Sequence, residues 1–137
     1  MSPRRTRPLR SALLLACCAA LSACPPNDLP APYRRLEVPR ARLGSAEARA
    51  RGRELYRRHC ALCHGERADG RGPRQALSSR PADFTDGLWR QRTSARRVFW
   101  IIREGKPNTA MAGWKLLDDG ETWDLVAYVL SVAREGP

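Results

Sequence analysis

Apolar residues recur at the spacing of a one-sided α-helix in three segments of the chain. The first segment follows Ser45, a residue type that often caps a helix N-terminus. Its apolar face is formed by residues at offsets of 4, 7, 8 and 11 from the first, namely Ala48, Gly52, Leu55, Tyr56 and His59. Because glycine weakens a helix, Gly52 indicates that another element approaches this helix closely.

The other two helical segments lie in the C-terminal part of the chain. One begins after Ser94 and runs to about Glu104, where Gly105 ends it. The last begins with Asp118 as N-cap and has Glu121 three residues later, which is the spacing of a capping box. The apolar faces consist of Val98, Ile101 and Ile102 in the first case and of Trp123, Val126, Ala127 and Leu130 in the second.

The segments between these helices, residues 65–93 and 106–117, are long and lack the alternation of a β-strand. Long loops are uncommon in a small domain unless they wrap around something. The pattern therefore predicts an all-α domain over residues 45–137. It would have about three helices, with long loops that surround a bound group.

The N-terminus has the features of an export signal. Residues 1–10 are cationic, and residues 11–23 are apolar but fewer than the roughly 20 that cross a bilayer as a helix. The segment ends in Leu21-Ser22-Ala23-Cys24, which resembles the lipobox of bacterial lipoproteins; an ordinary cleavage site is the alternative. We therefore expect residues 1–23 to be a cleaved lipoprotein signal peptide and Cys24 to carry lipid.

Residues 24–44 contain five prolines and little apolar periodicity. Such a composition favours an extended, semi-rigid tether over a packed element. At about 3.1 Å per residue, this tether would reach at most roughly 60 Å from the lipid.

The formal net charge of +11 raises the question of nucleic-acid binding. Residues 1–23 contain four arginines and no acidic residue, so their removal lowers the charge to +7. We expect no nucleic-acid partner.

Five cysteines would allow two disulfides and one free thiol. However, Cys17 and Cys18 lie in the signal peptide, and Cys24 takes the lipid. The two cysteines that remain lie in the string Cys60-Ala61-Leu62-Cys63-His64, which is the attachment motif of c-type haem.

This motif brings three haem-binding groups together. Cysteines at i and i+3 on a helical turn lie on one side, where each sulfur can form a thioether with a haem vinyl group, and His64 offers its imidazole to the iron. A thioredoxin-like dithiol would give His64 no role, and a zinc site would lack ligands because His59 alone remains. We expect one covalent haem c, with its iron, as the cofactor.

On these residues the chain resembles small bacterial monohaem cytochromes c of class I, over about residues 45–134. The matching strings are Leu55-Tyr56, Cys60 to His64-Gly65, Asp69-Gly70, Gly72-Pro73, Pro81-Ala82-Asp83-Phe84, the segment 105–114 and Trp123-Asp124-Leu125-Val126-Ala127-Tyr128-Val129. The resemblance implies a small cytochrome c fold, in which the N- and C-terminal helices cross beside the haem. It also implies that the backbone carbonyl of Pro73 accepts the Nδ1 proton of His64.

Met111 is the candidate for the sixth iron ligand. Apart from the initiator it is the only methionine, and it lies in the loop where the resemblance places the distal methionine. His59 is the rival, but it adjoins Cys60 and would have to reach the opposite face of the haem. The alternative role for Met111 is to fill a gap in the core.

Together these features predict a lipid-anchored cytochrome c that passes single electrons between membrane-associated redox proteins and has no catalytic residues. Two filled axial positions suit electron transfer, because no site is left for oxygen or peroxide. A subunit of a haem complex, a small peroxidase-like domain and a sensor domain are the alternatives. The lipid would hold the protein on a membrane facing the periplasm, the outer membrane being slightly favoured, or the cell exterior.

Overall fold

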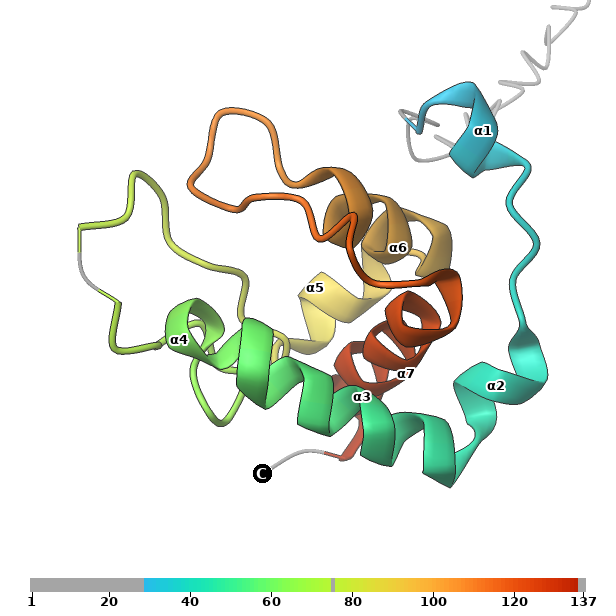
Figure 1. Ribbon diagram of the computed structural model, residues 1–137. Helices are drawn as coiled ribbons and strands as arrows, with labels where there is room; N and C mark the ends of the chain where they lie inside the picture. The colour runs from blue at the N-terminus through green and yellow to red at the C-terminus, as the bar shows by residue number, and fades with distance from the viewer. Residues whose placement is uncertain (1–28, 75, 136–137) are drawn as a thin grey trace, which may run out of the picture.

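Every regular element in the part of the chain that the structure describes is a helix. The computed structural model describes residues 29–74 and 76–135 (Figure 1). The helices are α1 (Ala31–Arg34), α2 (Arg40–Gly44), α3 (Ala46–His59), α4 (Ala61–His64), α5 (Gly87–Gln91), α6 (Ala95–Glu104) and α7 (Asp119–Glu135). The prediction of an all-α fold is confirmed.

The three predicted helices are α3, α6 and α7, and their caps are the predicted ones. The hydroxyl of Ser45 accepts a hydrogen bond from the backbone N–H of Ala48 at 3.2 Å, and Ser94 caps α6 in the same way. At the start of α7, Asp118 and Glu121 exchange backbone-to-side-chain hydrogen bonds of 3.0 and 2.7 Å, which is a capping box. Local sequence chemistry therefore sets where each long helix begins.

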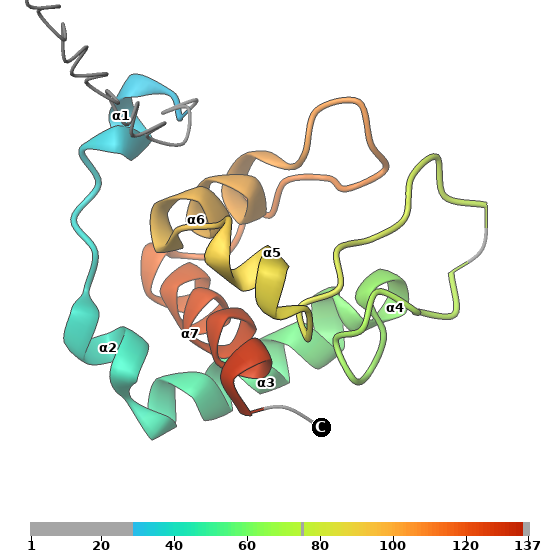
Figure 2. The ribbon, with the colours of Figure 1, turned by 180° about the vertical axis from the view of Figure 1, so that it is seen from behind.

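Helices α3 and α7 cross at Gly52, as the sequence predicted (Figures 1 and 2). A Cβ atom at this position would lie 2.9 Å from the Cβ of Tyr128 and 2.6 Å from the backbone carbonyl carbon of Asp124. One turn later Tyr56, which is fully buried, packs on Tyr128 with ring centroids 5.1 Å apart. Glycine thus allows the two backbones to come close enough to form the core.

Helix α6 completes the core on the other side of α7. Phe99 of α6 packs on Trp123 of α7 with ring centroids 4.5 Å apart, and both side chains are buried. The loop between α6 and α7 and the loop between α4 and α5 both project at the α4 end of the molecule (Figures 1 and 2).

The segment predicted to be an extended tether differs from that prediction where it is described. Residues 29–44, which we call the strap, include α1 and α2 and pack along α6 and α7 (Figure 2). Prolines begin both short helices, since Pro30 is the N-cap of α1 and Pro39 that of α2. The apolar side chains that attach the strap to the core are Tyr33, Leu36, Val38 and Leu43.

A buried carboxylate joins the strap to the two crossing helices. Asp124 of α7, whose side chain is 4% exposed, accepts hydrogen bonds from Nε of Arg42 at 2.6 Å and from Nε of Arg51 at 2.7 Å. Burial by itself would raise the pKa of Asp124, but the two arginines outweigh that effect and hold the pKa below its usual range.

The predicted signal peptide and the lipid site Cys24 lie outside the described residues. Within residues 29–74 and 76–135, no helix has both the length and the apolar character that crossing a membrane requires.

Candidate haem site

The predicted attachment motif forms the junction between α3 and α4. Cys60 ends α3 and begins α4, and its carbonyl accepts hydrogen bonds from the N–H groups of Cys63 at 3.1 Å and His64 at 2.9 Å. These contacts wind the motif into one helical turn, as the i, i+3 spacing predicted. Both thiols are free and partly buried.

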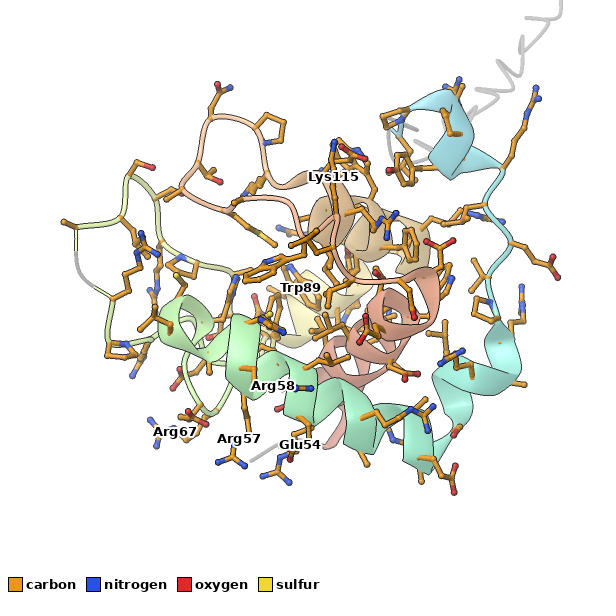
Figure 3. The ribbon with its side chains drawn as sticks, viewed as in Figure 1. Glu54, Arg57, Arg58, Arg67, Trp89 and Lys115 are labelled. Atoms are coloured by element: carbon orange, nitrogen blue, oxygen red, sulfur yellow. The ribbon has the colours of Figure 1, made fainter. Side chains whose placement is uncertain are left out.

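His64 is buried, with 8% of its surface exposed, and its ring is fixed from two directions. Its Nδ1 lies 3.1 Å from the carbonyl oxygen of Ala82, and Phe84 stacks on the imidazole with centroids 4.7 Å apart and planes inclined by 16°. A carbonyl oxygen only accepts hydrogen bonds, so Nδ1 carries the proton in this contact and Nε2 keeps its lone pair. Phe84 in turn packs on Trp89, which is half-buried and is labelled in Figure 3.

The acceptor for His64 therefore differs from the predicted one, because the carbonyl is that of Ala82 and not that of Pro73. The reason is the path of the loop after α4. The N–H of Phe84 donates to the carbonyl of Ala68 at 2.8 Å, so the later part of the loop folds back onto its beginning and presents Ala82 to the histidine. The sequence could not identify this acceptor, because every residue has the same backbone carbonyl. The string Pro81-Ala82-Asp83-Phe84, which contains it, was nevertheless one of those on which the resemblance rests.

Tyr56 holds the other end of the motif. Its hydroxyl donates to the carbonyl of Gly65 at 2.8 Å, directly after His64. Gly65 itself has φ +82°, a left-handed conformation that glycine adopts without strain. Helix α3 thus positions His64 through the backbone on one side, while the loop positions it on the other.

Met111 lies half-buried in the loop between α6 and α7. Its carbonyl accepts from the N–H of Lys106 at 3.1 Å. Further along the loop, Trp114 packs on His59 with ring centroids 4.7 Å apart, so the loop that carries Met111 touches the residue before Cys60.

The pKa of His64 also responds to the loop that carries Met111, because Lys106 belongs to that loop. Burial lowers the pKa of His64, the contact with Ala82 opposes that effect, and the positive charge of Lys106 lowers the pKa further. His64 is therefore held in the neutral form that binds a metal.

The thiol of Cys60 lacks the lowered pKa of a redox-active cysteine. Burial, with a smaller effect from Cys63, raises the pKa of the Cys60 thiol to about 12. A reactive dithiol needs a lowered pKa, which disfavours the thioredoxin-like alternative. In the described part of the chain, no group of three or more His, Cys, Asp or Glu side chains is arranged to hold a metal ion by itself.

Two neighbouring thiols and a neutral imidazole with a free Nε2 are the groups that a c-type haem requires. The family comparison agrees, because residues 47–129 match the family described as cytochrome c oxidase, cbb3-type, subunit III. The chain belongs to this family of c-type cytochromes. Membership implies that this cytochrome binds haem c.

Two similar proteins each contain a region that matches this chain. The chain is 36% identical over 90 residues to the dihydro-heme d1 dehydrogenase of Pseudomonas aeruginosa. The matching region covers 64% of this cytochrome but 16% of that enzyme. A chain of the Kuenenia stuttgartiensis reducing HAO-like protein complex has the same fold, with a TM-score of 0.56 and 24% identity over 71% of this chain and 45% of that one. Both relatives extend well beyond the region that this cytochrome matches.

Proposed function

We propose that the protein is a lipid-anchored electron carrier, which passes single electrons between membrane-associated redox proteins. One haem c would be bound through thioethers to Cys60 and Cys63, with His64 and Met111 as the two iron ligands. The haem supplies the one-electron chemistry, since its iron alternates between the ferric and ferrous states.

The observation that carries this proposal is the fixed orientation of His64. Its Nδ1 contacts the carbonyl of Ala82 at 3.1 Å, beside two unpaired thiols. An acceptor on Nδ1 fixes the ring and increases the basicity of the ligating nitrogen, as outer partners of metal-bound histidines do. A rigid proximal ligand keeps the site the same in both oxidation states.

Met111 is supported as the distal ligand by its loop, which contacts the attachment helix through Trp114 and His59. With both axial positions filled, no position is open to a substrate. This favours electron transfer over a peroxidase-like reaction.

Covalent attachment is tested by acid-acetone extraction of protein produced with the haem-maturation system. The colour should stay with the polypeptide, and Cys60→Ala combined with Cys63→Ala should leave the chain without haem and poorly folded. If the wild-type colour moves into the organic phase, the proposed thioether bonds do not exist.

The distal ligand is tested with Met111→Ala. The variant should lower the reduction potential, lose the weak sulfur-to-iron charge-transfer band of the ferric form, and bind carbon monoxide in the ferrous form. Leu116→Ala is the matched control, because Leu116 lies in the same loop and is fully exposed. Unchanged spectra in Met111→Ala would assign the sixth position to another residue.

Lipid at Cys24 would confine this carrier to a membrane surface facing the periplasm, the outer membrane being slightly favoured, or the cell exterior. The docked strap shortens the reach that composition alone suggested. If the strap stays in place, the four residues 25–28 separate it from the lipid, and in polyproline geometry they span about 12 Å. We infer that the haem domain works close to the membrane and does not swing over roughly 60 Å.

Cys24→Ala tests this anchor. The variant should be released as a soluble, haem-loaded protein with an unchanged spectrum, and its electron delivery to membrane partners should fall. If it remains in the membrane fraction after high-salt and carbonate washes, lipid at Cys24 is not the anchor.

A second candidate is a subunit of an oxidoreductase complex. It is favoured by the similarity to a dehydrogenase, in which the matching region is 16% of a longer chain. Purification of the solubilised native protein separates the two candidates, since a subunit co-purifies with its redox partners in fixed ratio and a free carrier does not.

A further inference from the structure

One carboxylate at the end of α6 joins the strap to the loop that carries Met111. The hydroxyl of Tyr33, in the strap, donates to Oε1 of Glu104 at 2.6 Å. The ammonium of Lys115, at the far end of the loop, lies 2.8 Å from Oε2 of the same residue. Figure 3 places Lys115 over α6. The two oxygens of Glu104 thus bind two segments that are distant in sequence.

This carboxylate closes the base of the Met111 loop. Glu104 is the last residue of α6, and the loop leaves it through Gly105, which has φ +83°. The ion pair with Lys115 brings the returning end of the loop back to the residue where the loop begins. Next to it, the N–H of Trp114 donates to the carbonyl of Ile102 at 2.8 Å.

Met111 rests directly on this base. A Cβ atom at Gly105 would lie 2.6 Å from the backbone carbonyl oxygen of Met111, so the two backbones touch. Gly105 and Ala112 also form an antiparallel bridge. A shift of Glu104 therefore reaches the backbone of Met111 through a single intervening residue.

The strap holds Tyr33 in place for this contact. Its ring packs against Phe99 with centroids 6.4 Å apart, and Nε of Arg96 donates to the carbonyl of Leu36 at 2.7 Å. Burial, followed by the hydrogen bond to Glu104, raises the pKa of Tyr33 to about 12. Lys115 and then Tyr33 lower the pKa of Glu104. At neutral pH the tyrosine is therefore a protonated donor and the glutamate an ionised acceptor.

We propose that Tyr33, Glu104 and Lys115 are positioning residues, which together hold Met111 at the sixth position of the iron. We call these three residues the loop clamp. The inference rests on the proposed function, because it takes Met111 as the distal ligand. It assigns the strap a role beyond linking the domain to the lipid: docking of the strap determines how readily Met111 leaves the iron.

The loop clamp acts on local opening and has little effect on global stability. Glu104 and Lys115 are solvent-exposed to a large extent, and exposed ion pairs add little to the free energy of unfolding. The free energy needed to open one loop is far smaller than the free energy of unfolding the whole domain. The same contacts therefore form a large part of the free energy that keeps the loop closed. Weak contacts at this place can therefore control a ligand exchange that leaves the core intact.

Imidazole binding to the ferric, haem-loaded protein measures this exchange, because imidazole enters when Met111 leaves. The sulfur-to-iron band reports the displacement. We expect Tyr33→Phe and Lys115→Met each to tighten apparent imidazole binding about two- to fivefold. Glu104→Gln should have about the effect of Lys115→Met, because the amide has no charge for Lys115 but its oxygen can still accept a hydrogen bond from Tyr33. Adding Lys115→Met to Glu104→Gln should give little further change, since both remove the same ion pair.

Glu66→Gln is the matched control. Glu66 is an exposed glutamate whose carboxylate lies 3.7 Å from Arg57, away from the strap and the Met111 loop. It should leave imidazole binding at the wild-type value. Thermal unfolding of all variants should stay within a few degrees of wild type, which separates positioning from general loss of stability.

The proposal is overturned if the loop-clamp variants bind imidazole like wild type, or if Glu66→Gln shows the same change. An effect of Lys115→Met without one of Tyr33→Phe would refute the role of the strap. Failure of the proposed function is distinguishable: in that case the wild type lacks the sulfur band, or Met111→Ala binds imidazole no more tightly than wild type.

Discussion

Gly52→Ala tests whether the close crossing of α3 and α7 builds the domain. The added methyl group would lie 2.6 Å from the carbonyl carbon of Asp124 and 2.9 Å from the Cβ of Tyr128, and the carbonyl oxygen of Asp124 is nearer still. Ordinary contacts at a Cβ atom begin at 3.4 Å. Backbone atoms cannot rotate out of the way, so the two helices must move apart.

The size of the effect follows from two opposing contributions. Overpacking a close contact costs about 1–3 kcal/mol, and a backbone clash lies at the upper end of that range. Alanine in place of glycine returns about 1 kcal/mol of helix propensity. The net loss is about 2 kcal/mol, which for a domain of this size lowers the Tm by about 8–16 °C.

Thermal unfolding of the haem-loaded protein, followed by circular dichroism, measures this loss. Gly44→Ala is the matched control: Gly44 is also helical, and a Cβ atom there would have no neighbour within 4 Å. The control should keep the wild-type Tm or rise by a few degrees. A Gly52→Ala variant as stable as Gly44→Ala would refute the close crossing.

Three further changes test other parts of the fold. Tyr56→Phe leaves the carbonyl of Gly65 without its donor and should cost about 1–2 kcal/mol in denaturant unfolding. Asp124→Asn should cost about 1.5–3 kcal/mol near neutral pH. Because the folded-state pKa of Asp124 is lowered, its contribution is complete above the unfolded pKa of about 3.9 and is lost as the pH falls through the folded pKa. The difference between wild type and Asp124→Asn should therefore shrink only below about pH 4, and a difference that stays constant down to pH 2 would contradict the ion pairs. Leu117→Ala should cost about 2–3 kcal/mol, whereas Leu116→Ala, at a fully exposed position, should change stability by less than about 0.5 kcal/mol; equal losses would contradict the burial of Leu117.

The sequence by itself determined the parts of this protein that depend on neighbours along the chain. Helix starts at Ser45, Ser94 and Asp118 are fixed by hydrogen bonds that span three residues, and the spacing of Cys60, Cys63 and His64 is a property of one helical turn. Gly52 marked the place of a close contact, although it could not name the partner.

Only the tertiary structure decided how distant segments meet at the site. Ala82 replaces Pro73 as the partner of His64 because the loop folds back through a backbone hydrogen bond, and a backbone carbonyl is the same in every residue. Prolines in the strap report local stiffness, which suits an extended tether and a docked segment equally well. The docking comes from Tyr33 meeting Glu104 and Arg42 meeting Asp124, contacts that span 71 and 82 residues and have no period that a sequence pattern could reveal.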